Sequence, residues 1–219
     1  MDRVPFDPYD FFGYLASGLL ILVGMQLVLG FPQILGHELK FVDSAFLLLA
    51  IYVAGQIIAT PARALLEDLV VGKILHRPSV NLLRAKRPLV RGILFPGFYR
   101  PLPEPIRRRL LERKDAEGIE GTDESFFLQV RYKPEVLENE GLSKRLDSFI
   151  SKYGFSRNLA FSSLVVGCAL LWKSFSGHDS EALKYSIAAI SASFLLFYRY
   201  LKFFRQYSYE LFNAYAGGR

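Results

Sequence analysis

Uncharged, largely apolar stretches alternate with charged ones along this chain, and the charged residues mark where each stretch begins and ends. No Asp, Glu, Lys or Arg occurs between Asp10 and Glu38, and nineteen uncharged residues separate Asp43 from Arg63. About 20 helical residues are enough to cross the hydrocarbon core of a bilayer, which is about 30 Å thick. Both stretches are therefore predicted to be transmembrane helices.

Two later stretches are shorter, with fifteen uncharged residues between Arg157 and Lys173 and fourteen between Lys184 and Arg199. By length alone, either could be a core helix of a soluble protein. The flanking basic side chains can reach lipid headgroups, and Trp172 lies where interfacial aromatic residues occur in membrane proteins. We therefore expect an all-α membrane protein with four transmembrane helices in two hairpins. A bundle with only two spans is the alternative.

The segment between the two hairpins, residues 61–156, is long enough for a small domain and is predicted to be mostly α-helical. Thr60 and Pro61 resemble an N-cap followed by proline at the first helical position, so a helix is expected to continue beyond the second span. Repeated prolines predict irregular or extended backbone over 87–105. Residues 126–134 could form a strand or a helical turn.

Two further helices are expected in this insert. One follows Pro105 and ends at Gly118, and the other begins with Ser143 as its N-cap and enters the third span. The tail alternates aromatic and basic residues, which favours anchoring at the membrane interface over packing on the insert. The predicted organisation is an N-terminal hairpin (1–60), a basic insert (61–156), a C-terminal hairpin (157–201) and a tail (202–219).

Composition and charge agree with this plan and orient it. Hydrophobic residues make up 51% and the mean hydropathy is +0.21, but 22% of residues are charged, so the chain is not embedded throughout. The net charge is +6. Residues 63–157 hold nineteen Lys and Arg, whereas the two short connections hold very few. Because basic loops stay on the cytoplasmic side, the insert and both termini are predicted to be cytoplasmic.

Charge within the insert is uneven, with a net of +9 over residues 63–114 and −6 over 115–140. Arginine predominates in the basic part, and its planar fork suits bidentate contact with phosphate. The basic part could bind a nucleotide or oligonucleotide, or it could lie against anionic membrane lipid. Phe95, Phe98 and Tyr99 could stack a base or form the core of a loop. The candidate ligand-binding residues are Lys73, Arg77, Arg84, Lys86, Arg87, Arg91, Arg100, Arg107, Arg108 and Arg109.

Polar groups inside the predicted spans are few. Ser186, Ala189 and Ser193 fall on one face of the fourth helix, where they could line a pore or let helices pack closely. No acidic or basic residue lies well inside a span, which argues against a proton- or ion-coupled transporter.

Enzyme signatures are missing from the sequence: it has no phosphate-binding glycine loop, no HExxH and no GxSxG. A single cysteine excludes a disulfide framework, and the wide spacing of the three histidines argues against a histidine metal site. We therefore expect a protein that is not an enzyme and that has no metal and no cofactor.

The opening PYDFFGYLASGLL, the second span ending in YVAGQIIA, the basic insert and KYGFSRN before the last hairpin form a familiar plan. It resembles small four-helix membrane proteins of bacterial anti-phage defence, such as the membrane effector of Hailong or the membrane component of Kiwa. The resemblance implies a homo-oligomer in the bacterial inner membrane. Its cytoplasmic part would respond to a nucleotide oligomer or to a cytosolic DNA-binding partner protein.

Two functions are compatible with these observations. The first is an oligomeric inner-membrane effector in anti-phage defence, either a ligand-gated pore or a membrane-permeabilising protein, whose basic insert senses a nucleotide or oligonucleotide. The alternative is a membrane-anchored sensor or scaffold that recruits a cytosolic partner protein, through the acidic stretch 115–140, without conducting ions.

Overall fold

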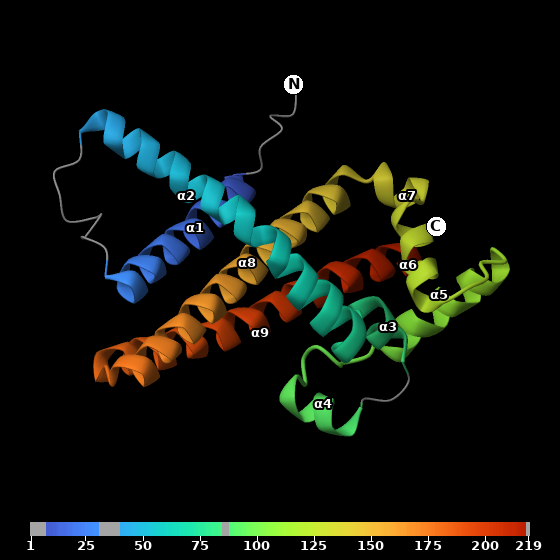
Figure 1. Cartoon of the computed structure of the whole chain (residues 1–219). Coiled ribbons are helices and arrows are strands. Elements are labelled where there is room, and N and C mark those ends of the chain that lie inside the picture. The colour runs from blue at the N-terminus through green and yellow to red at the C-terminus, as the bar shows by residue number, and fades with distance from the viewer. Residues whose placement is uncertain (1–7, 31–39, 85–87, 218–219) are drawn as a thin grey trace. The chain divides into compact units, whose positions relative to one another are not determined.

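The computed structural model describes residues 8–30, 40–84 and 88–217, and every regular element in these ranges is a helix (Figure 1). Four of the helices are long and apolar enough to cross a membrane, and the predicted all-helical class is confirmed. The elements are α1 (Pro8–Leu29), α2 (Phe41–Ala62), η1 (Arg63–Leu75), α3 (Pro78–Leu83), α4 (Leu89–Leu94), α5 (Glu104–Ala116), α6 (Asp123–Arg131), α7 (Pro134–Leu137), α8 (Glu140–Gly177) and α9 (Ser180–Gly217).

Internal contacts divide the chain into two compact units. We call Met1–Leu69 with Gly154–Tyr200 the bundle unit, and Val70–Tyr153 with Leu201–Arg219 the insert unit. All three points at which the chain passes from one unit to the other lie inside helices, namely η1, α8 and α9. The chain therefore has regular backbone hydrogen bonding at each passage.

In the bundle unit, α1 and α2 pack with their backbones in contact because glycine lies at each crossing point. A Cβ atom added to Gly18 would lie 1.8 Å from the carbonyl oxygen of Ile51, and one added to Gly55 would lie 1.9 Å from that of Tyr14. Neither position can hold a side chain without separating the helices. Small residues at such positions are typical of helix packing in membranes, where close van der Waals contact drives association.

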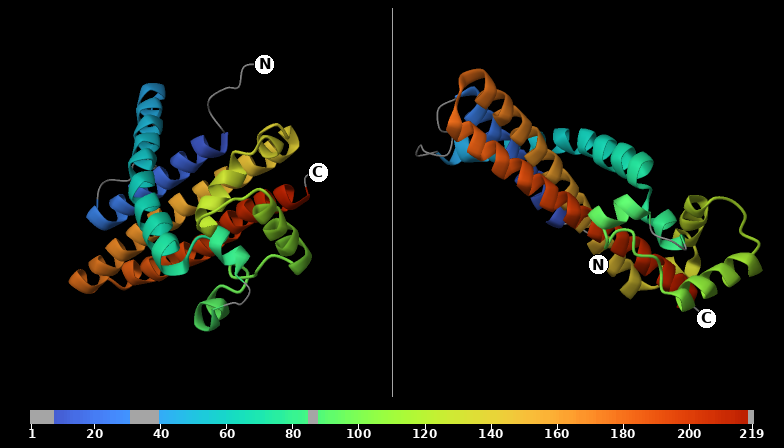
Figure 2. Two further views of the ribbon diagram at one scale, coloured as in Figure 1. Left: turned by 90° about the vertical axis from the view of Figure 1, so that its right-hand side faces the viewer. Right: turned by 90° about the horizontal axis from the view of Figure 1, so that it is seen from below.

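Helices α8 and α9 lie antiparallel in the bundle unit, and only two residues separate them (Figure 2). His178 takes a left-handed conformation with φ of 50°, and the Asp179 carboxylate accepts hydrogen bonds from the backbone N–H groups of Glu181 and Ala182. An aspartate at this position caps the new helix by satisfying its first N–H groups. The connection is therefore shorter than the polar gap in the sequence indicates.

The expected continuation of a helix beyond α2 is confirmed, since α2 runs directly into η1, but Thr60 is not an N-cap and Pro61 is not a first helical residue. Both residues lie inside a continuous helix that runs from Phe41 to Leu75. Pro61 has no N–H to donate, and the N–H of Arg63 is shared between the carbonyls of Ala59 and Thr60. The change from α-helical to π-helical geometry follows directly after the proline, which accounts for the loss of α register there.

The insert unit has a hydrophobic core built around α6. Thr122 caps this helix, accepting a hydrogen bond from the Ser125 N–H at 3.2 Å. Phe126 is fully buried and stacks on Phe212 of α9, with ring centroids 5.8 Å apart. The segment that could have been strand or helical turn is thus helical. The tail, for which interfacial anchoring was expected, instead packs into this core.

Two other expectations are corrected. Helix α8 begins at Glu140, and the Asn139 side chain accepts from the N–H of Leu142, so Asn139 rather than Ser143 caps it. The segment expected to be irregular contains the short helix α4 between its prolines. The helix predicted to end at Gly118 is confirmed as α5, and Gly118 has the positive φ of 60° that favours glycine after a helix.

Candidate functional sites: cations of the insert and polar groups of the bundle

The C-terminal end of η1 is capped by side chains that come later in the insert unit. The guanidinium of Arg91 donates to the carbonyl of Ile74 at 2.5 Å, and the Tyr99 hydroxyl donates to that of Leu75 at 2.9 Å. A helix leaves its last carbonyls unpaired, and cations are favourable there. Arg91, predicted to bind a ligand, is therefore already engaged in capping a helix.

The aromatic residues after α4 belong to the core. Phe98 and Tyr99 are 3% and 2% exposed, and their rings meet edge to face with centroids 5.2 Å apart. Burial raises the pKa of the Tyr99 hydroxyl, although Arg91 and Arg84 act in the opposite direction. Of the two roles considered for these rings, the structure supports a loop core, because buried rings offer no face to a base.

Other candidate cations are divided between ion pairs and the surface. Three arginines have acidic partners within the insert unit: Arg77 with Glu124, Arg107 with Glu104 at 3.1 Å, and Arg108 with Glu112 at 3.3 Å. Arg84 is half-buried, whereas Lys73, Arg100 and Arg109 are exposed. Lys86 and Arg87 lie outside the described residues. Candidate cations that remain available to an anion are thus mainly the exposed ones on η1, after α4 and on α5.

Arg113 joins α5 to the end of α9. Its guanidinium donates to Glu117 at 2.9 Å, to Glu135 at 2.5 Å and to the carbonyl of Tyr215 at 2.7 Å. Lys133 also donates to Glu117, at 2.5 Å, and these two cations lower the pKa of Glu117 to about 2. Arg113 belongs to the basic part of the insert in the sequence, but in the structure its hydrogen bonds hold the end of α9 against α5.

A shielded ion pair lies in the bundle unit, between the η1 carboxylate of Glu67 and the α8 guanidinium of Arg157. Their side chains are 15% and 13% exposed. Arg157 also donates to the Asn158 side chain at 3.2 Å. In the sequence, Arg157 marks only the flank of a predicted span. Its 90-residue separation from Glu67 explains why no local pattern predicts the pair.

The three small residues considered for α9 face α8 of the same chain. Ser186 donates to the carbonyl of Gly167 at 2.8 Å, and Ser193 donates to that of Ala160 at 2.7 Å. Ala189 lies between them, 3.4 Å from where a Gly167 Cβ would be. Within one chain these residues serve close helix packing, the second of the two roles considered for them.

A polar stripe runs along α2 instead. Tyr52, Gln56 and Thr60 recur every four residues, and Arg63 continues the same face after a further three. The Gln56 amide donates to the Tyr52 hydroxyl at 3.0 Å, and Gln56, Thr60 and Arg63 are all exposed. The i, i+4, i+8 spacing is the signal in the sequence that could have identified this stripe.

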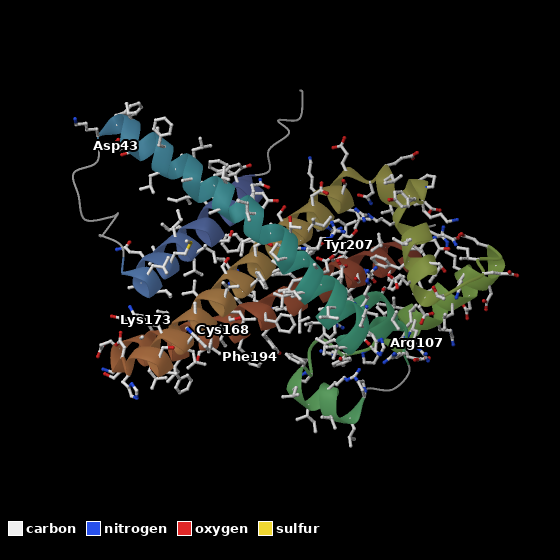
Figure 3. The ribbon with its side chains drawn as sticks, in the orientation of Figure 1. Asp43, Arg107, Cys168, Lys173, Phe194 and Tyr207 are labelled. Atoms are coloured by element: carbon white, nitrogen blue, oxygen red, sulfur yellow. The ribbon has the colours of Figure 1, made fainter. Side chains whose placement is uncertain are left out.

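The bundle unit also holds an apolar cavity of about 290 Å³ among α1, α2 and α8, with Gly24, Ile58 and Val166 in its wall. In the same unit, the ammonium of Lys173 (labelled in Figure 3) donates to the carbonyl of Leu27 at 2.5 Å. The lining carries no polar surface. It therefore suits hydrocarbon and offers nothing to orient a polar substrate.

Comparison with known proteins adds no assignment: no family model, no curated protein and no solved structure matches the chain. Among the residues that the structure describes, no three His, Cys, Asp or Glu side chains are grouped closely enough to hold a metal ion.

Proposed function

We propose that the protein is an oligomeric membrane effector that conducts ions, with α2 lining the conduction path and the insert unit controlling it. The observation that carries this proposal is the exposed polar stripe on α2. Gln56 lies seven residues before Arg63, the first charged residue after α2, which is about 10 Å along the helix axis. An amide at that depth would lose hydrogen bonds if it faced lipid. Water in a lumen formed by several copies would satisfy it.

The helical passages between the units support control by the insert. A change in the insert unit can act on the bundle unit through η1, α8 or α9, because none of these passages is a loop. The Glu67–Arg157 pair joins η1 to α8 inside the bundle unit, directly beside two of the passages. Two helices held by a charge pair are a suitable element for switching between two arrangements.

Cysteine accessibility tests whether the polar stripe of α2 faces a water-filled lumen. In a Cys168→Ala background, Gln56→Cys and Thr60→Cys are reconstituted in liposomes, and ion flux is measured before and after a charged methanethiosulfonate reagent is added. We expect the reagent to reduce flux in both variants. Ile57→Cys is the matched control, since Ile57 is 68% exposed and lies on a different face. If the reagent leaves ion flux unchanged in Gln56→Cys as well as in Ile57→Cys, conduction along this stripe is refuted. Liposomes that show no ion flux under any condition would also refute it.

The proposed signal is an anionic ligand, with a nucleotide or oligonucleotide as the chemical class, recognised by exposed cations of the insert. The experiment measures flux with a panel of nucleotides and short oligonucleotides. Arg108→Glu with Arg109→Glu should abolish the response. Lys144→Glu, which reverses a side chain that is 81% exposed elsewhere in the unit, should leave it unchanged. A response that survives the double reversal would exclude these two arginines from recognition.

A scaffold that recruits a cytosolic protein is the second candidate, favoured by apolar exposure in the acidic stretch. Leu128, Tyr132 and Leu137 are 45%, 67% and 60% exposed there. Exposed apolar side chains beside carboxylates are typical of a protein-binding surface. If the protein is a scaffold, liposomes that contain it should show no ion flux, and a partner protein should co-purify with it. The Tyr132→Asp and Leu137→Asp variants should lose that partner. Either function places the protein in a bacterial inner membrane and, by the resemblance, in anti-phage defence.

A further inference from the structure

The short helix α4 carries an unusual number of exposed apolar side chains for a segment outside the four long helices. Leu89, Val90, Ile93 and Leu94 are 85%, 69%, 76% and 59% exposed. In a helix these positions fall within one face, at i, i+1, i+4 and i+5, while Arg91 and Gly92 lie on the other side. The helix therefore presents a continuous apolar face that no described residue of its own unit covers.

The opposite side of α4 contacts the rest of the insert unit. Arg91, on that side, donates to the carbonyl of Ile74, and the buried pair Phe98 and Tyr99 fixes the chain just after the helix. Helix α4 projects from the rest of the insert unit in Figure 1 and in the left view of Figure 2. The apolar face is thus held outward by defined contacts on its other side.

The charge around α4 is of one sign. No acidic residue occurs between Asp68 and Glu104, and seven basic residues occur there. Among those described, Arg84 and Arg100 lie on either side of α4 in the sequence. An apolar helical face flanked by cations is the pattern of segments that lie in the interface of an anionic membrane. An acidic protein surface would match the cations but would not need four aliphatic side chains side by side.

We propose that α4 is a membrane-docking element, which inserts its apolar face among the headgroups of an anionic bilayer while the neighbouring arginines contact lipid phosphate. This role is independent of ion conduction. It would give the insert unit an attachment to the bilayer in addition to its helical passages into the bundle unit.

The experiment uses the full chain in lipid nanodiscs, with Cys168→Ala and a fluorophore on Ile93→Cys. Lipids that carry a nitroxide quencher near the headgroup report insertion. We expect strong quenching in discs that contain phosphatidylglycerol and weaker quenching in pure phosphatidylcholine. A fluorophore on Glu112→Cys is the control, because that side chain is 64% exposed on α5 of the same unit. Leu89→Cys repeats the measurement at an independent position.

Charge variants test the arginines. Each basic residue near an anionic surface contributes about 1 kcal/mol, so Arg84→Gln or Arg100→Gln should lower the ratio of docked to undocked α4 about fivefold. Two outcomes would overturn the proposal. One is quenching at 89 and 93 no greater than at 112 in anionic discs. The other is a disulfide between two copies of the Ile93→Cys variant, together with quenching that does not depend on lipid charge. That result would show that a second copy of the chain, and not lipid, covers this face.

Discussion

Removing one charge of the Glu67–Arg157 pair should destabilise the bundle unit far more than removing an exposed charge. Glu67→Gln keeps the shape of the side chain but leaves the Arg157 guanidinium without its carboxylate. Both side chains are about one-seventh exposed, at 15% and 13%. Breaking a fully buried pair from one side costs about 3–5 kcal/mol. Because some solvent reaches this pair and Asn158 still accepts from Arg157, we expect a loss of about 2–3 kcal/mol.

For a chain of this length, 1 kcal/mol shifts the melting temperature by about 2–4 °C. Glu67→Gln should therefore lower it by about 4–12 °C when far-UV circular dichroism follows thermal unfolding in detergent. The control is Glu181→Gln, which breaks a pair with Lys184 whose side chains are 62% and 70% exposed. Such a surface pair contributes at most about 1 kcal/mol.

The double variant Glu67→Leu with Arg157→Met separates the charge effect from packing. It leaves no unpaired ion, so it should recover most of the stability lost in Glu67→Gln. If Glu67→Gln and Glu181→Gln shift the melting temperature equally, the pair is not shielded as the structure describes. If the double variant is as unstable as the single one, packing rather than charge explains the loss.

Two further predictions concern packing and pH. Gly18→Ala and Gly55→Ala should each lower the free energy of unfolding by about 1–3 kcal/mol through overpacking, because the new Cβ would meet a carbonyl oxygen at under 2 Å. The control is Gly154→Ala, which has nothing within 4 Å of its new Cβ and should be neutral or stabilising in the same thermal assay. Glu117 has a pKa lowered from 4.5 to about 2 in the folded protein, so its ion pairs stabilise the insert above about pH 4.5 and are lost as the pH falls towards about 2. Glu117→Gln should therefore be less stable than the wild type by about 1–2 kcal/mol at neutral pH, after allowance for solvent screening, and the difference should vanish near pH 2. A difference between these two proteins that is constant from pH 7 to pH 2 would contradict the assignment.

Local patterns were sufficient for the helical class and for the four long apolar helices. The charges at Asp43 and Arg63, or at Arg157 and Lys173, delimit apolar runs because burying a charge in hydrocarbon is costly. A window of about 20 residues is therefore enough to detect such a run in the sequence. The positive φ after α5 was likewise predictable from Gly118 alone. These features depend on neighbours in the sequence.

The partners of the charged side chains depended on the tertiary structure. Arg113 reaches the carbonyl of Tyr215 across 102 residues, and Arg157 reaches Glu67 across 90. In the sequence both arginines belong to a basic surface or a membrane flank, because composition records how many cations are present but not which carbonyls and carboxylates they meet. The same holds for the tail, whose aromatic rings suited a membrane interface until α6 supplied a core for them. Hydrophobicity is a property of each residue, whereas a hydrogen bond or an ion pair requires two atoms that only folding brings together.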